Sequence, residues 1–319
     1  MSDILYLLLG FLGFLGLFYG GNVLVKGTVQ TANVLNIPAH LIAITIVALG
    51  TSAPELVVSI NAVLKGSPDL AWGNVVGSNI ANLLLVIGGA SLYITLRDDS
   101  KSLRLDIFWM ILSTIILFIF GYFFRSLNPI FGFIFILTLF TILIIMTFNA
   151  EKNEHDYDLI YTKSFFSPLT IGLCLTFGGI IVVLISSEIL ISSAIKMSMS
   201  FGIEQSLIGV TIVALGTSLP EISASVAAAR NGHTDIAIGN VLGSNLFNSL
   251  GILGASSIAS YPKNLETPLS FVNYDLPIML LATLILGGYL FYFKRVERIF
   301  GPLLIILYML YISFNFIYK

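Results

Sequence analysis

The amino-acid sequence predicts an all-α membrane protein with ten transmembrane helices in two inverted five-helix repeats. The prediction depends on composition, on apolar segments of membrane-spanning length and on a polar motif that occurs twice. The chain has 319 residues, of which 57% are hydrophobic and only 10% are charged, and its mean hydropathy is +0.98. Soluble domains have about 45–50% apolar and about 25% charged residues, so the composition indicates an integral membrane protein. A net charge of −2 gives no indication of a nucleic-acid partner.

The apolar segments have the length of membrane-spanning helices. A helix needs about 20 mostly apolar residues to cross the bilayer, and only helices or closed barrels satisfy the backbone there. We expect spans near residues 4–32, 39–64, 70–93, 104–124, 129–148, 166–199, 205–230, 235–259, 271–293 and 299–318. The first and the sixth are longer than one crossing requires, which indicates tilt. The N-terminal stretch lacks the basic region and cleavage site of a secretory signal, so we interpret it as a retained span.

One strongly polar connection, residues 149–164, divides the chain into residues 1–148 and residues 165–319. Each half carries five expected spans, and five is odd, so the second half enters the membrane from the opposite side. Repeats of this inverted kind are typical of secondary transporters. The distribution of Lys and Arg predicts a cytoplasmic 149–164 loop and two extracellular termini. We expect a multi-pass protein of the cell membrane that works as a monomer, with the lipid bilayer as its surroundings.

The repeat is visible in the sequence itself. VALGTSAPE runs from Val47 to Glu55, and VALGTSLPE runs from Val213 to Glu221. The longer stretch Thr45 to Ser91 aligns without a gap with Thr211 to Ser257, and the similarity is densest at polar and small residues. A duplication kept only for packing would preserve lipid-type residues equally. The pattern therefore indicates a site shared by the two copies.

The first part of the motif combines a helix break with oxygen donors. Pro54 has no N–H to donate to the carbonyl of Gly50, and Pro220 repeats this relation with Gly216. Broken backbone at membrane depth is tolerated where it lines a cavity or is buried in protein, and it leaves carbonyl oxygens free. Hydroxyls and carboxylates flank each break, at Thr51, Ser52, Glu55, Thr217, Ser218 and Glu221. Such a set of oxygens suits a hard cation such as Ca²⁺.

The second part of the motif adds hydroxyl and amide groups. Ser78 and Asn82, like Ser244 and Asn248, are four residues apart and therefore share one helical face. Gly73, Gly77, Gly239 and Gly243 have the spacing that lets another helix approach closely, and we interpret them as packing residues. Zinc or copper would prefer His and Cys, which this composition does not offer. His40, His155 and His233 fall at expected helix ends or loops, so we interpret them as solvated or capping residues without a ligand role.

Intramembrane carboxylates are costly and by default mark a functional pathway. Glu55 and Glu221 occupy matching positions, and Lys26 and Lys196 are the only bases that we place inside spans, so a purely structural ion pair is the weaker interpretation. Glu188 in the sixth span has Asn22 as its counterpart. Symmetry gives it no support as an ion ligand, and we favour a structural hydrogen bond there.

The paired GTSxPE and GNVxGSN segments resemble the α-repeats of the cation/calcium exchanger superfamily, and especially its sodium/calcium exchanger branch, in prokaryotic form. The resemblance implies antiport of Ca²⁺ against Na⁺ through a central site of four ion positions, without a cofactor and without enzymatic chemistry. It also implies a sliding, gating role for the long first and sixth helices. The loop at residues 149–164 is too short for the calcium-sensing domain of animal exchangers.

The resemblance assigns roles to individual residues of this chain. Glu55 and Glu221 would hold Ca²⁺, with the backbone carbonyls of Thr51 and Thr217. Ser52, Ser78 and the carbonyl of Ala48 would form one Na⁺ position, and Ser218, Ser244 and the carbonyl of Ala214 its symmetric mate. Asn82 and Asn248 would complete the middle of the site. Potassium-dependent members have an aspartate in place of Asn248, so the amide resembles that of potassium-independent exchangers.

Two other kinds of function compete with Na⁺/Ca²⁺ exchange. A proton/calcium antiporter could use two titratable glutamates, although the hydroxyls at Ser52, Ser78, Ser218 and Ser244 favour sodium. A cation channel would also have an acidic, oxygen-lined path, but inverted halves with one central site favour a carrier. An intramembrane hydrolase is disfavoured, since no histidine or other base is placed beside Ser52 or Ser218.

Overall fold

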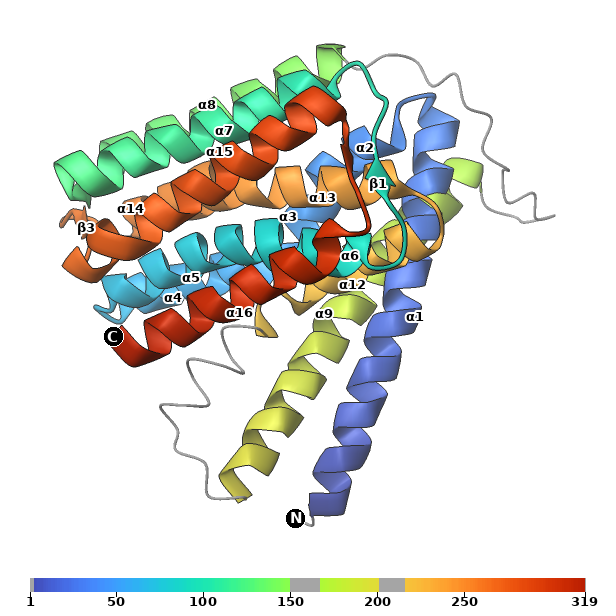
Figure 1. Cartoon of the computed structure of the whole chain (residues 1–319), viewed down its shortest axis with the longest axis horizontal. Helices are drawn as coiled ribbons and strands as arrows, with labels where there is room; N and C mark the ends of the chain where they lie inside the picture. Colours follow the sequence, from blue (N-terminus) through green and yellow to red (C-terminus); the bar gives the residue numbers. More distant parts are fainter. Residues whose placement is uncertain (1–2, 150–166, 201–215, 319) are drawn as a thin grey trace.

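The computed structural model describes residues 3–149, 167–200 and 216–318, and over these residues the protein is a bundle of apolar helices (Figure 1). Seven of the described helices are long and apolar enough to cross a membrane, or eight if one bent pair counts as a single span. The membrane-protein prediction is therefore confirmed. The full arrangement of ten inverted helices stays a prediction, because much of the expected seventh span lies outside the described residues.

The described helices and strands follow the expected spans closely. The N-terminal half contains α1 (Asp3–Leu35), α2 (Ala39–Ile42), the π-helical turn η1 (Ala43–Val47), α3 (Ala48–Thr51), α4 (Ala53–Leu64), α5 (Pro68–Ala81), η2 (Asn82–Val86), α6 (Ile87–Ser91), β1 (Leu96–Arg97), α7 (Leu103–Ile119), η3 (Phe120–Phe124), β2 (Ser126–Leu127) and α8 (Pro129–Asn149). The C-terminal half contains α9 (Pro168–Ser200), α12 (Leu219–Arg230), α13 (Thr234–Leu246), η5 (Phe247–Ile252), α14 (Leu253–Ala259), β3 (Leu265–Glu266), η6 (Phe271–Asp275), α15 (Leu276–Phe293), β4 (Arg295–Val296) and α16 (Phe300–Tyr318).

The helix breaks form where the proline motif predicts them. The chain bends by 43° between the helix that ends at Thr51 and α4, and Ser52 is the hinge residue, with φ −84° and ψ 7°. Pro54 sits in the first turn of α4, where its missing N–H costs no helical hydrogen bond. Ser218 has nearly the same dihedrals, φ −87° and ψ 1°, and Pro220 occupies the first turn of α12. The two motif copies therefore have the same local conformation at their prolines.

The helices that carry the second part of the motif, α5–η2–α6 and α13–η5–α14, form the centre of the molecule. In the most apolar stretch of Thr234–Ala259, 94% of the residues are buried, and the corresponding value for Pro68–Ser91 is 72%. The same measure is between 22% and 33% for the other long spans, whose side chains face outward. Polar side chains of α5 and α13 are thus enclosed by other helices, and the lipid-type residues lie on the peripheral helices. This burial places the second part of both motifs away from lipid.

The long helices α1 and α9 lie side by side and run at a steep angle to the rest of the bundle (Figure 1). Each has 33 residues. Glycines allow their backbones to approach: a Cβ at Gly13 would lie 2.9 Å from the carbonyl oxygen of Ser186, and one at Gly172 would lie 2.9 Å from the amide nitrogen of Thr31. The expected great length of these two helices is confirmed, and they form a pair of their own.

Two short antiparallel strand pairs, which the sequence pattern did not predict, tie connecting segments together. Leu96 and Arg97 of β1 pair with Val296 and Arg295 of β4, and Ser126 and Leu127 of β2 pair with Glu266 and Leu265 of β3. Each pair joins a loop of the N-terminal half to a loop of the C-terminal half. Two residues per strand give too short an alternation to be recognised in sequence.

Candidate ion-binding site

The carboxylates of Glu55 and Glu221 meet in the interior of the bundle. Each lies in the first turn of the helix that follows its break, and each side chain is 1% exposed. The hydroxyl of Ser52 donates a hydrogen bond to Oε1 of Glu221 over 3.0 Å, which links the break of the first repeat to the carboxylate of the second. Glu55 is close enough to Glu221 for their negative charges to interact. The two motif copies therefore contribute to one site.

Many polar atoms around these carboxylates have no hydrogen-bond partner within the described part of the chain. They are both carboxylate oxygens of Glu55, Oε2 of Glu221, the hydroxyls of Ser218 and Ser244, Oδ1 of Asn82, and both side-chain polar atoms of Asn248. Buried polar atoms are normally satisfied, because an unpaired one costs about 1–3 kcal/mol. Except for the Asn248 amide nitrogen, every atom in this set can offer a lone pair to a cation. A dehydrated cation would satisfy them.

Asn74 and Asn240 donate hydrogen bonds to the backbone just after the two helix breaks. The side-chain amide of Asn74 donates to the backbone carbonyl of Glu55 and to the hydroxyl of Ser59, both over 2.9 Å. Asn240 repeats the arrangement, donating to the hydroxyl of Ser225 over 3.0 Å and to the carbonyl of Glu221 over 3.5 Å. The sequence comparison identifies these asparagines as repeated residues but assigns them no role. Their role depends on contacts between helices, which sequence spacing does not reveal.

Amide groups from the two repeats also meet directly. Asn82 donates from Nδ2 to Oδ1 of Asn245 over 3.0 Å, which leaves its own Oδ1 free of hydrogen bonds within the described chain. The hydroxyl of Thr51 lies 3.4 Å from Oδ1 of Asn240. Asn82 begins the π-helical turn η2, and Asn248 lies in η5. Such turns, frequent at functional sites, were not predicted.

The remaining candidate ligands have varied positions. Ser78 is buried on α5 beside the Glu55 carboxylate, and Ala48 is buried at the start of α3. Thr217 is partly buried next to the second break. Ala214 lies outside the described residues. All of the described candidates except Thr217 are thus buried, and they belong to the segments around the two breaks and to α5, η2, α13 and η5.

Glu188 and His40 both lie outside the candidate site. Glu188 is exposed on α9 and accepts a hydrogen bond from Ser192 over 3.0 Å, as the interpretation of a structural hydrogen bond expects. The interpretation of His40 as a solvated or capping residue is wrong: its side chain is buried and contacts two aspartates. Asp98 and Asp106 come after the predicted span 70–93 in the sequence, far from His40, so only the fold brings the three residues together. Among the described residues, no ion pair involves Glu55 or Glu221.

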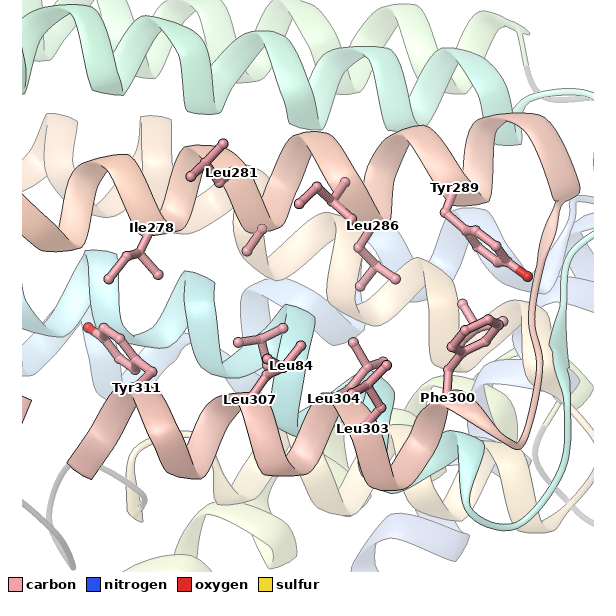
Figure 2. Close-up of a pocket in the computed structure, with 13 residues that line it drawn as sticks. Leu84, Ile278, Leu281, Leu286, Tyr289, Phe300, Leu303, Leu304, Leu307 and Tyr311 are labelled. Atoms are coloured by element: carbon pink, nitrogen blue, oxygen red, sulfur yellow. The ribbon is translucent and has the colours of Figure 1, made fainter. Parts of the chain in front are cut away.

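An apolar cavity of about 370 Å³ lies elsewhere, between α15 and α16 (Figure 2). Its wall is formed almost entirely by leucine, isoleucine and aromatic side chains, with Leu84 of η2 at its base and Tyr289 and Tyr311 toward its two ends. None of the candidate cation ligands lines it. An unsolvated cation gains nothing from such a surface, so this cavity is separate from the polar site.

A buried carboxylate pair at two matched helix breaks, within a bundle of membrane-spanning helices, is the kind of site found in ion transporters. The family model described as "Sodium/calcium exchanger protein" matches residues 5–148 and 171–317. The chain belongs to the sodium/calcium exchanger family.

Known proteins similar to this chain agree with that assignment. A "Putative antiporter CaxA" of Alkalimonas amylolytica is 33% identical, covering 94% of this chain and 95% of that protein. The "Sodium/calcium exchanger MaX1" of Methanosarcina acetivorans is 30% identical, with 95% of each chain covered. A solved structure of the sodium-calcium exchanger NCX_Mj, soaked with Na⁺ and Ca²⁺, superposes with a TM-score of 0.84 at 28% identity, covering 97% of this chain and 98% of that one. The predicted resemblance is therefore confirmed.

Proposed function

We propose that this protein is a secondary active antiporter that exchanges Na⁺ for Ca²⁺ across the cell membrane, without K⁺ and without a cofactor. The observation that supports it most is the buried pair Glu55 and Glu221, surrounded by oxygen atoms without hydrogen-bond partners among the described residues. A site of this composition matches the preference of Ca²⁺ for about 6–8 oxygen ligands. The names of MaX1 and NCX_Mj as sodium/calcium exchangers support the same activity.

In this proposal each repeat supplies one half of the ligands. Ca²⁺ lies between the carboxylates of Glu55 and Glu221 and the carbonyls of Thr51 and Thr217. One Na⁺ position uses Ser52, Ser78 and the carbonyl of Ala48, and the other uses Ser218, Ser244 and the carbonyl of Ala214. Asn82 and Asn248 complete the middle. The unpartnered hydroxyls of Ser218 and Ser244 support the second Na⁺ position.

Charge explains why Ca²⁺ and Na⁺ do not occupy the site at the same time. Two carboxylates carry a charge of −2, which one Ca²⁺ neutralises and which two Na⁺ neutralise equally. Both loads need the same two negative charges for compensation, so they do not bind together. If the empty site cannot change sides because its carboxylates would cross the membrane uncompensated, the Na⁺ gradient drives Ca²⁺ in the opposite direction.

Proton/calcium antiport is the second candidate, since a pair of buried carboxylates could also carry protons. The relative named only as a putative antiporter is compatible with either ion. The serine hydroxyls near both carboxylates favour Na⁺, because a proton carrier has no need of additional oxygen ligands. Asn248 in place of an aspartate favours independence from K⁺.

The test is uptake of ⁴⁵Ca²⁺ by purified protein reconstituted in liposomes, with an outward gradient of Na⁺, K⁺, Li⁺ or H⁺ compared at equal osmolarity. We expect uptake with Na⁺ alone and no further stimulation when K⁺ is added. Uptake driven by a pH gradient and not by Na⁺ would replace the proposal by proton/calcium antiport. Unitary currents far above the turnover of a carrier would indicate a channel instead.

A further inference from the structure

His40 lies at the centre of a buried ion-pair cluster in α2, at the start of the helical segment that leads to the first helix break. Its side chain is 1% exposed in α2. Nδ1 lies 2.8 Å from Oδ2 of Asp98 and 3.2 Å from the backbone oxygen of Asp235, and Nε2 lies 2.9 Å from Oδ2 of Asp106. The four residues come from α2, the segment after β1, α7 and α13. One imidazole ring therefore joins four segments from both halves of the chain.

The contacts of the ring decide its protonation. All three neighbours of the ring nitrogens are oxygen acceptors, and a ring nitrogen contacts such an oxygen favourably only when it carries a hydrogen. Nδ1 therefore carries a hydrogen, and with Asp106 ionised Nε2 carries one as well, which makes His40 an imidazolium. Burial by itself would raise the pKa of Asp98, but the charge of His40, whose Nδ1 is 2.8 Å from Oδ2, and the hydrogen bond from the backbone N–H of Ser100 hold that pKa below its ordinary value. The Asp235 carboxylate and, beyond it, His233 are the other titratable groups near the cluster.

The cluster lies where α2 packs closely against α13. A Cβ at Gly239 of α13 would lie 2.9 Å from Nδ1 and 2.9 Å from the backbone oxygen of His40. One turn further, a Cβ at Gly243 would collide with the backbone oxygen of Ile44. The segment α2–η1–α3 leads directly to Ser52, and α13 carries Asn240 and Ser244. The position of His40 against α13 therefore sets how the oxygens of one repeat face those of the other.

The sequence of the opposite half does not repeat His40 or Asp98. When the two halves are aligned on β1 and β3, Asp106 falls opposite Asp275 and Asp98 falls opposite Thr267. Asp275 accepts a hydrogen bond from the hydroxyl of Tyr311 over 2.9 Å. The residue that corresponds to His40 in the motif alignment is Ser206. The pair His40 and Asp98 thus occurs in one half of the sequence only, and a packing role shared by both halves does not account for it.

We propose that His40 is a positioning residue, a buried cation that holds the start of α13 against α2 and so fixes the register of the cation ligands contributed by the two repeats. The inference rests on the proposed ion-exchange function. It assigns to His40 no contact with the transported ion. Its physical basis is that removing the cation leaves the buried carboxylates of Asp98 and Asp106 uncompensated.

The first test is thermal unfolding of the purified wild type and of His40→Gln between pH 5 and pH 8. Loss of one partner of a buried ion pair predicts a midpoint roughly 5–10 °C below that of the wild type at pH 8. Acidification protonates the uncompensated aspartates, so this deficit should shrink toward pH 5. The Asp98 carboxylate of the wild type stays ionised over this range, because its pKa is below its ordinary value. A deficit that is independent of pH would overturn the proposal.

Two further variants keep the test decisive. His233→Gln changes the other described histidine near α13 but keeps the contacts of His40 with Asp98 and Asp106, so its midpoint at pH 8 should stay near that of the wild type. The double variant His40→Gln/Asp106→Asn removes one uncompensated carboxylate and should recover part of the lost midpoint at pH 8; no recovery would contradict a charge-based role. If His40→Gln does not fold, the double variant is compared directly with Asp106→Asn.

The second test measures ⁴⁵Ca²⁺ uptake in liposomes. Supporting residues around a metal site typically change affinity by about 10–100-fold. His40→Gln should therefore raise the Ca²⁺ concentration for half-maximal uptake by at least about tenfold, with a smaller change in maximal rate. An unchanged half-saturation concentration would overturn the positioning role. If the wild type transports no Ca²⁺, the proposed function fails, whereas the unfolding experiment still decides whether His40 is a buried cation.

Discussion

At the scale of single residues, the described part of the chain leaves the two carboxylates of the candidate site without the partners that a buried charge normally has. Glu55 and Glu221 are both buried, and three of their four carboxylate oxygens have no hydrogen-bond partner among the described residues. The one bonded oxygen accepts from Ser52, across the boundary between the repeats. In a protein that served only as a scaffold, such groups would be replaced or paired, because isolated buried carboxylates are costly.

Neutralising either glutamate should therefore remove transport. We expect Glu55→Gln and Glu221→Gln each to abolish Na⁺-dependent ⁴⁵Ca²⁺ uptake in liposomes, because each loses a charge and an oxygen ligand of Ca²⁺. Glu188→Gln is the matched control, since Glu188 is exposed on α9 and its partner is Ser192. It should transport at nearly the wild-type rate. Near-normal uptake by both glutamine variants of the central pair would exclude the proposed site.

At the scale of elements, breaks and unusual turns supply the backbone geometry of the site. Each proline lies in the first turn of a new helix after a hinge serine. The next helix of each repeat, α5 or α13, passes into a π-helical turn at or next to an asparagine of the motif. Asn74 and Asn240 hold the chain at the breaks. The glycines of α13 bring its backbone against α2–η1–α3. The site is thus formed by contacts between elements rather than by any one segment.

Close packing of α13 can be tested with one added methyl group. Gly243→Ala places a Cβ against the backbone oxygen of Ile44 and 2.7 Å from the Cβ of Ala48. Such overpacking costs about 1–3 kcal/mol, so the midpoint of thermal unfolding should fall by several degrees. Gly288→Ala on α15 is the control, because its Cβ would meet no described atom within 4 Å. Equal midpoints for the two variants would show that the predicted close approach is absent.

At the scale of the whole molecule, the arrangement of two halves determines which side of the membrane each connection faces. The strand pair β1–β4 lies at one end of the bundle, and the loop that contains Lys263 and leads to β3 belongs to the other, if the helices cross the membrane as predicted. From the distribution of basic residues we expect the first of these ends to face the cytoplasm.

This topology is testable with single cysteines. Cys174 is the only cysteine, so Cys174→Ala gives a cysteine-free background. In intact cells, Lys263→Cys should react with a membrane-impermeant maleimide, and Lys101→Cys should react only after the cells are lysed. Both labelled positions are exposed. The reverse pattern would invert the predicted orientation, and labelling of both from one side would contradict the odd number of spans in each half.

The amino-acid sequence by itself determined the class of the protein and the residues of its candidate site. Apolar segments of this length predict membrane-spanning helices. A proline beside a carboxylate inside such a segment breaks the helix and buries a charge, and its occurrence at two matching positions indicates a functional site. These signals are local, because each depends on a few residues close together in the chain. For the same reason the helix bounds were predicted closely.

Only the tertiary structure decided which of these residues meet and what holds them. The bond from Ser52 to Glu221, the amide pair of Asn82 with Asn245 and the burial of His40 between Asp98 and Asp106 all join residues far apart in the sequence. Their partners follow from the packing of helices and from short strand pairs, which no period in the sequence encodes. His40 was expected to be solvated because it begins a helix, and its burial follows from α13 and the segment after β1 covering that end.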